Sequence, residues 1–227
     1  MAVNFVAGEF LDVSSGQKLT ALQVMRDAPV IPVIVLTDTV QAVLLARALV
    51  AGGIRMLEVT LRTPQALACI EAIARDVPEA VVGAGTVRSA ADAQACAMAG
   101  ARFAVSPGYT HAVGQACRDA GIPLLPGVAT GSEIMAAQED GWSELKFFPA
   151  MQAGGPSMLK AWGGPFSNVN FCPTGGVTIE NAPTFLALSN VVCVGGSWLT
   201  PADSLAHSNW SQITALAIQA AQLQRHC

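Results

Sequence analysis

Residues 56–64 read Met-Leu-Glu-Val-Thr-Leu-Arg-Thr-Pro, and they contain the unit from which the rest of the chain is built. Met56–Thr60 is a short apolar run of residue types that favour strands. Thr63 and Pro64 then read as a helix start, with the threonine as the cap and the proline in the first turn. An alanine-rich segment with helical periodicity continues to about Asp76. The stretch therefore predicts one strand followed by one helix.

This strand–helix unit recurs along the chain at a spacing of roughly 19 to 26 residues, with no break in composition. The other predicted strands are Val30–Val35, Val81–Ala84, Phe103–Ser106, Ile122–Pro126, the run around Lys146, Asn170–Pro173 and Val191–Gly195. Strands that alternate with helices pair in parallel, and eight such units in about 200 residues predict a closed (β/α)8 TIM barrel of the α/β class. An open doubly wound sheet is the alternative fold, although it normally contains fewer strands.

No linker rich in proline, glycine or serine divides the chain, so a single barrel domain is predicted for residues 29–227. Residues 1–28 are predicted to be an N-terminal extension that includes a short helical segment near Leu19–Arg26. Hydrophobic residues make up 52% of the chain and charged residues only 12%. A chain of this composition can bury a large core, and it is expected to cover further surface by self-association.

Charge and composition exclude several classes of protein. The net charge of -4 provides no basic face for nucleic acid. The apolar runs are too short to cross a membrane bilayer, and the N-terminus lacks the early basic residues of a signal peptide. The six cysteines form no CxxC pair and indicate buried, reduced thiols of a cytoplasmic protein. The three histidines are not at ligand spacing from one another, so no metal site is predicted.

Residues 144–150 read Glu-Leu-Lys-Phe-Phe-Pro-Ala, which places Lys146 inside an apolar run of strand type. A buried lysine is costly unless it has a function, and a desolvated amine can act as a nucleophile. The other two lysines, Lys18 and Lys160, lie in a polar segment and in a predicted helix, where the ammonium group can stay in water. The alternative is that Lys146 lies on an edge strand and extends past its aromatic neighbours to solvent.

The active site of a (β/α)8 barrel lies at the C-terminal ends of its strands, and Glu58 is expected there together with Lys146. Side chains alternate along a strand, so Glu58 and Thr60 share one face while Leu57 and Val59 share the other. If Leu57 and Val59 pack against the helices, Glu58 points into the barrel. The alternative is that Glu58 forms a structural ion pair with a neighbouring arginine.

Groups suited to binding anions follow several of the predicted strands. Arg62 and Thr86 follow the second and third strands and could hold a carboxylate, although they could also be a surface charge and a turn residue. Paired glycines follow the last two strands, where backbone N–H groups can approach a phosphate and a hydroxyl can add a donor. The predicted phosphate site comprises Thr174, Gly175, Gly176, Gly195, Gly196 and Ser197. The alternative is that these glycines serve only as tight turns.

Six sequence blocks, in order and at matching spacing from about Pro29 to the C-terminal helix, resemble the KDPG/KHG family of class I aldolases. They are Leu57–Thr63, Gly83–Val87, Ser106–Gly108, Lys146–Ala150, Phe171–Gly176 and Gly195–Trp198. KDPG is 2-keto-3-deoxy-6-phosphogluconate. The resemblance implies a (β/α)8 barrel, typically a homotrimer, that acts in the Entner–Doudoroff pathway without a cofactor.

The resemblance further implies a carbon–carbon lyase that cleaves KDPG to pyruvate and D-glyceraldehyde 3-phosphate through a lysine Schiff base. The implied site residues are Lys146 and Glu58 for catalysis, Arg62 and Thr86 for the pyruvyl carboxylate, Pro107 and Phe148 for an apolar wall, and the two glycine pairs with Ser197 for the phosphate. This chain departs from the family at Met151-Gln152, where an acidic residue is expected, and the departure bears on substrate preference.

Three other functions stay open at this point. The same chemistry could act on 4-hydroxy-2-oxoglutarate or on the phosphogalactonate epimer, because the glycine pairs do not fix the stereochemistry of the sugar acid. A metal-dependent lyase or isomerase would need a cluster of histidine and carboxylate ligands, which the sequence does not provide. A phosphate-binding barrel without catalysis would retain the glycine pairs but would not need a buried lysine.

Overall fold

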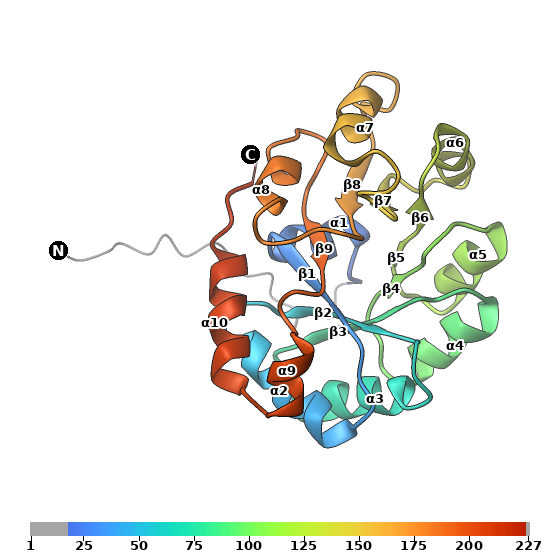
Figure 1. Cartoon of the computed structure of the whole chain (residues 1–227). Coiled ribbons are helices and arrows are strands. Elements are labelled where there is room, and N and C mark those ends of the chain that lie inside the picture. The colour runs from blue at the N-terminus through green and yellow to red at the C-terminus, as the bar shows by residue number, and fades with distance from the viewer. Residues whose placement is uncertain (1–17, 226–227) are drawn as a thin grey trace.

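The computed structural model describes residues 18–225, which form a barrel of parallel strands surrounded by helices (Figure 1). The strands are β1 (Val30–Ile34), β2 (Met56–Thr60), β3 (Val81–Gly85), β4 (Ala104–Val105), β5 (Leu124–Leu125), β6 (Gly127–Val128), β7 (Glu144–Phe147), β8 (Asn170–Pro173) and β9 (Val194–Gly196). The helices are α1 (Ala21–Asp27), α2 (Thr39–Ala51), α3 (Ala66–Asp76), α4 (Ala90–Met98), α5 (His111–Asp119), α6 (Gly131–Glu139), α7 (Gly155–Trp162), α8 (Ala182–Leu186), α9 (Ala202–Ala206) and α10 (Trp210–Ala221). Residues 1–17 of the predicted N-terminal extension lie outside the described residues.

The barrel closes through two short connections between its two sheets. Six strands follow the order β5-β4-β3-β2-β1-β9, and the other three follow the order β6-β7-β8. Only Pro126 separates β5 from β6, and the N–H of Lys146 donates to the Pro126 carbonyl at 2.8 Å. Single bridges from Phe171 to Val191 and from Thr174 to Gly195 join β8 to the chain around β9. The predicted (β/α)8 barrel is therefore confirmed, with β5 and β6 as one strand position.

Several helix starts follow the sequence, but one prediction is wrong. The side chains of Asp38, Ser89 and Thr110 cap α2, α4 and α5 as their positions indicate. Thr63 was expected to cap the helix after β2, yet α3 begins at Ala66 and has no side-chain cap. The Thr63 hydroxyl instead donates to the Leu36 carbonyl, just beyond β1, and Gln65 occupies the N-cap position of α3.

Other element boundaries differ from the sequence prediction by a few residues. The strand predicted at Val30–Val35 ends at Ile34, and the strand predicted at Phe103–Ser106 is limited to Ala104–Val105. Helix α6 starts at Gly131, because Thr130 and Glu133 form a capping box there. The short helix α9 was not predicted, since its five residues carry too little periodicity to be recognised. No helix within the described part of the chain has both the length and the apolar character needed to cross a membrane.

The alternation of side chains along the strands divides the core into two layers. Leu57 and Val59 on β2 face outward and belong to the large cluster between the strands and the helices. Met56, on the opposite face of β2, belongs to a second cluster in the barrel interior. The inner cluster consists of Val24, Met25, Ile31, Met56, Val81, Phe103, Val105, Leu125, Cys172 and Cys193.

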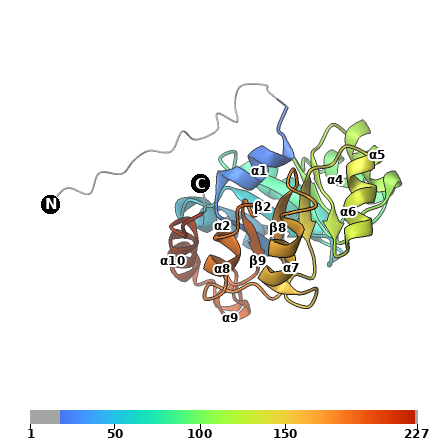
Figure 2. The same ribbon diagram turned by 90° about the horizontal axis from the view of Figure 1, so that it is seen from above.

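Helix α1 covers one end of the barrel (Figure 2). Its buried residues Val24 and Met25 pack into the inner cluster near the N-terminal ends of the strands. Thr20 caps this helix through a capping box with Gln23, which fixes its start. The barrel is thus filled with apolar side chains from one end, and polar side chains in its interior lie toward the other end, where the strands finish.

The cysteines of the described chain are free and buried, and burial predicts their reactivity. Desolvation raises the pKa of Cys96 to about 12 and the pKa of Cys117 to about 11.

Since the thiolate is the nucleophile, we expect iodoacetamide at pH 8 to leave Cys96 and Cys117 unmodified in the native protein. Urea-unfolded protein is the control and should be alkylated at both positions, as peptide mass spectrometry can show. Equal labelling of the native and the unfolded protein would contradict the buried placement.

Candidate active site

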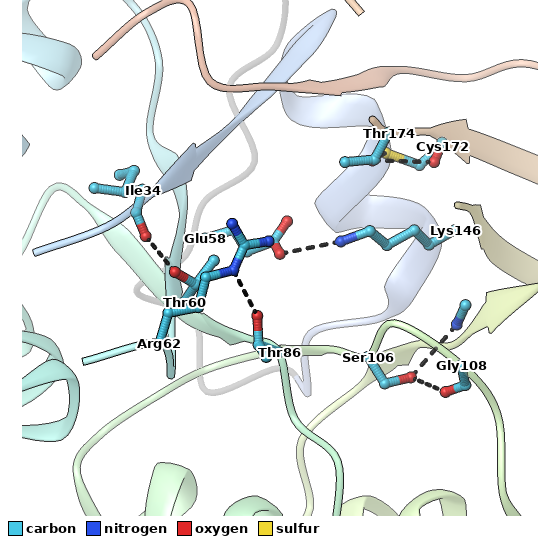
Figure 3. Close-up of polar contacts among 11 residues, drawn as sticks. Ile34, Glu58, Thr60, Arg62, Thr86, Ser106, Gly108, Lys146, Cys172 and Thr174 are labelled. Carbon is cyan, nitrogen blue, oxygen red and sulfur yellow. Dashed lines mark hydrogen bonds and ion pairs between the residues drawn. The ribbon is translucent and has the colours of Figure 1, made fainter. Parts of the chain in front are cut away.

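A lysine and a carboxylate meet inside the barrel, as Figure 3 shows. Lys146 on β7 and Glu58 on β2 have side chains that are only 5% and 3% exposed, and Lys146 Nζ lies 3.3 Å from Glu58 Oε1. The amine also lies 5.2 Å from the centroid of the Phe148 ring. An amine and a carboxylate in direct contact can pass a proton from one to the other.

The strand register and one glycine make room for Glu58. Its neighbours Leu57 and Val59 face the helices, so Glu58 points into the barrel as the alternation along β2 requires. Gly85, at the end of β3, lies beside the carboxylate, and a Cβ atom at this position would be 2.3 Å from Glu58 Oε1. Thr60 Oγ1, on the same face of β2, donates to the Ile34 carbonyl at 2.9 Å. The position of the carboxylate therefore depends on the absence of a side chain at Gly85.

Arg62 and Thr86 lie together at the ends of β2 and β3 (Figure 3). Arg62 Nε donates to Thr86 Oγ1 at 3.4 Å, and the backbone of Thr86 has a φ of 60°, a conformation that is rare for a threonine. A guanidinium and a hydroxyl held side by side can both donate to one planar anion. This geometry suits the carboxylate site that the sequence predicts.

A cavity of about 300 Å³ opens at this end of the barrel. Its lining residues are Val33, Val35, Arg62, Phe148, Thr174, Gly175, Gly176, Val177, Gly195, Gly196 and Ser197. All six residues of the predicted phosphate site are among them. The buried pair adjoins the cavity, since Phe148 contacts Lys146 and Val33 stands beside Glu58 in the sheet register.

The glycine pairs serve both as turns and as points of close approach. Gly175 and Gly176 have φ values of 102° and 73°, which an L side chain rarely adopts. At Gly195 a Cβ atom would be 2.2 Å from Thr174 Oγ1. Gly175 and Gly176 therefore form a tight turn, as the alternative interpretation requires. A tight turn at these residues can still bind an anion, because the same backbone lines the cavity.

One residue of the predicted apolar wall, Pro107, lies outside the cavity lining, and three cavity residues were not predicted. Pro107 is exposed and is not part of the cavity lining; its backbone passes close to Gly127. Met151 lies behind the glycine loop, where its side chain faces Gly176. Val33, Val35 and Val177 line the cavity but were not predicted. The alternation of side chains along β1 points Val33 into the barrel, so the sequence could have identified it. Val177 lies in a loop, and only its position after the two glycines relates it to the site.

The described residues contain no group of three or more histidine, cysteine or carboxylate side chains that could hold a metal ion. His111 lies on the outer helices instead, where its Nδ1 is 2.9 Å from Asp140 Oδ2. Tyr109 also bonds to Asp140, and burial together with this carboxylate raises the pKa of Tyr109 to about 12. This cluster is separate from the cavity at the ends of the strands.

Comparison with known proteins places this geometry in a family. The family model described as KDPG and KHG aldolase matches residues 22–216. The 2-dehydro-3-deoxy-phosphogluconate aldolase of Dickeya dadantii (strain 3937) is 49% identical over 203 residues, which cover 89% of this chain and 95% of that protein. The KHG/KDPG aldolase of Escherichia coli (strain K12) is 49% identical over 205 residues, which cover 90% of this chain and 96% of that protein.

A solved structure agrees with the sequence comparison. The KDPG aldolase of Legionella pneumophila, with pyruvate captured at low pH as a covalent carbinolamine intermediate, matches with a TM-score of 0.88. It shares 46% sequence identity, and the match covers 91% of this chain and 100% of that chain. The chain therefore belongs to the KDPG and KHG aldolase family.

Proposed function

We propose that this protein is a class I aldolase that cleaves 2-dehydro-3-deoxy-6-phosphogluconate to pyruvate and D-glyceraldehyde 3-phosphate. The observation that carries the proposal is the buried contact of 3.3 Å between Lys146 Nζ and Glu58 Oε1, beside a cavity with paired glycine loops. A phosphate-binding barrel without catalysis would have no need of this contact. Family membership supports the same reaction.

The proposed reaction begins when the neutral Lys146 amine adds to the C2 ketone of the substrate. Glu58 gives and takes the protons that turn the carbinolamine into an iminium ion with loss of water. Glu58 then removes the proton from the C4 hydroxyl. The C3–C4 bond breaks, its electrons move to the iminium, and D-glyceraldehyde 3-phosphate leaves. Protonation of the remaining enamine at C3 and hydrolysis release pyruvate and restore the amine.

The remaining site residues would position the substrate. Arg62 and Thr86 would hold the carboxylate next to the ketone, since they lie together at the strand ends. Phe148, which lines the cavity, would supply the apolar wall. The phosphate would lie against the glycine loops that line the cavity, together with the hydroxyls of Thr174 and Ser197.

We also propose a homotrimer that acts in the cytoplasm. The exposed side chains of Val40 and Leu44 on α2 support self-association, because they leave apolar surface at the rim of the barrel. The free cysteines of the described chain suit a reducing compartment.

The proposed substrate can be tested against its closest competitors. We expect kcat/KM for KDPG to exceed that for 4-hydroxy-2-oxoglutarate by about tenfold or more, because hydrogen bonds to a charged phosphate contribute about 1.5 to 3 kcal/mol. Pyruvate release in a coupled assay measures both substrates and the phosphogalactonate epimer. EDTA should leave the rates unchanged, since the iminium ion formed on Lys146 accepts the electrons of the breaking bond. Loss of activity in EDTA, or faster cleavage of the epimer, would refute the proposed reaction or its substrate.

Two substitutions test the placement of the carboxylate. Glu58→Gln removes the proton acceptor, and Gly85→Ala places a methyl group 2.3 Å from the present position of Glu58 Oε1. We expect each to lower kcat by about 100-fold, the magnitude typical of losing or misplacing a general base. Gly164→Ala is the matched control, because no atom lies within 4 Å of the added methyl group. If Glu58→Gln retained the activity of Gly164→Ala, the carboxylate would have no part in the reaction. If Gly85→Ala retained it, the position of the carboxylate would not depend on Gly85.

A further inference from the structure

Asn181 immediately precedes α8, but its side chain does not cap that helix. It turns back onto the loop that follows β8. Asn181 Oδ1 accepts the N–H of Thr178 at 2.8 Å, and Asn181 Nδ2 donates to the Gly176 carbonyl at 3.0 Å. An asparagine at the start of a helix usually accepts an N–H of the first turn. Here both ends of the amide are instead committed to the glycine loop.

The bond to the Gly176 carbonyl fixes the direction of the next N–H group. The Gly176–Val177 peptide is trans, so its carbonyl and its N–H point in opposite directions. The carbonyl faces Asn181, which is not part of the cavity lining, whereas Val177 is. The N–H groups of Gly176 and Val177 have no acceptor within residues 18–225. The Val177 N–H therefore points away from Asn181, and Val177 lines the cavity.

The two glycines alone do not hold this arrangement. Gly175 and Gly176 both have positive φ values, and a backbone without side chains can rotate such a peptide at little cost. On its outer side the loop rests against Met151, whose Cγ would lie 2.8 Å from a Cβ at Gly176. Asn181 thus supplies the side-chain hydrogen bond that selects one orientation of the Gly176 peptide.

We propose that Asn181 is a positioning residue for the phosphate of the substrate. It holds the Gly176–Val177 peptide so that the Val177 N–H donates to a phosphate oxygen in the cavity. Asn181 itself does not touch the substrate. The inference rests on the proposed function and deepens it, because it assigns the orientation of the phosphate loop to a side chain outside the cavity.

The experiment compares two variants at this position with a control. Asn181→Ala removes both amide hydrogen bonds to the loop, together with the contact of 4.0 Å between Asn181 Nδ2 and Met151 Sδ. Asn181→Asp keeps the acceptor for the Thr178 N–H but sets a carboxylate oxygen against the Gly176 carbonyl. Asn209→Ala is the matched control, because Asn209 Oδ1 accepts the Gln212 N–H at 3.2 Å at the start of α10, away from the cavity. Thermal unfolding of each variant checks that the barrel is intact.

Three measurements distinguish an effect on phosphate binding from an effect on the chemistry at Lys146. Calorimetry measures the affinity of the unreacted protein for inorganic phosphate. Steady-state kinetics give KM and kcat for KDPG. Deuterium exchange at C3 of pyruvate, followed by NMR, reports the chemistry of the lysine without any phosphate group.

For Asn181→Ala and Asn181→Asp we expect phosphate affinity to fall and KM to rise by about tenfold, the loss typical of a weakened bond to a charged group. The values of kcat and of the exchange rate should stay within about twofold, and Asn209→Ala should retain its phosphate affinity. Unchanged phosphate affinity in Asn181→Ala would overturn the proposal, as would an equal loss of phosphate affinity and of exchange. A wild-type protein that binds phosphate but does not cleave KDPG would overturn the proposed function alone.

Discussion

The buried contact between Lys146 and Glu58 is the constraint on which the rest of the site depends. Removing two charges from water costs several kcal/mol for each ion, and apolar residues in place of such a pair are often neutral or stabilising by about 1 to 4 kcal/mol. Stability therefore gives no reason to keep this pair inside the barrel. A reaction that needs a nucleophilic amine beside a proton acceptor does give one.

The barrel meets this constraint by dividing its interior into two zones. Toward the N-terminal ends of the strands the interior is apolar, and α1 covers that end with Val24 and Met25. Toward the C-terminal ends the inward positions carry Glu58, Lys146 and Thr174, each 5% exposed or less. Water is thus excluded from one side of the pair, and the loops at the other side surround the cavity that a substrate can enter.

Regular features of the sequence were sufficient to predict the barrel and the inward direction of Glu58. Alternation along β2 and the repeated order of strand, cap and helix express backbone geometry, which short-range patterns reveal. The patterns failed where a long-range contact competed with a local one. The Thr63 hydroxyl bonds to Leu36 instead of capping α3, and the strand expected up to Pro126 continues beyond it as β6 because neighbouring strands pair on both sides of the proline.

The candidate site shows the same limit. Paired glycines indicate a loop that can bind an anion, but the sequence does not show that Asn181 reaches back to hold Gly176. The cavity position of Val33 follows from its phase in β1, whereas that of Val177 depends on how the loop folds. The direction of a side chain in a strand could therefore be predicted from its position along the strand. Side chains in loops needed the three-dimensional structure.

The central claim is that one buried amine forms a covalent bond with a 2-oxo acid, and reductive trapping tests it most directly. The protein is incubated with pyruvate and borohydride, digested, and mapped by mass spectrometry at Lys146 and at the chain's other two lysines, Lys18 and Lys160. The account predicts a stable adduct of one reduced pyruvyl group on Lys146 and none on the other two. An adduct at another lysine, or no adduct under conditions in which the protein is folded, would contradict it.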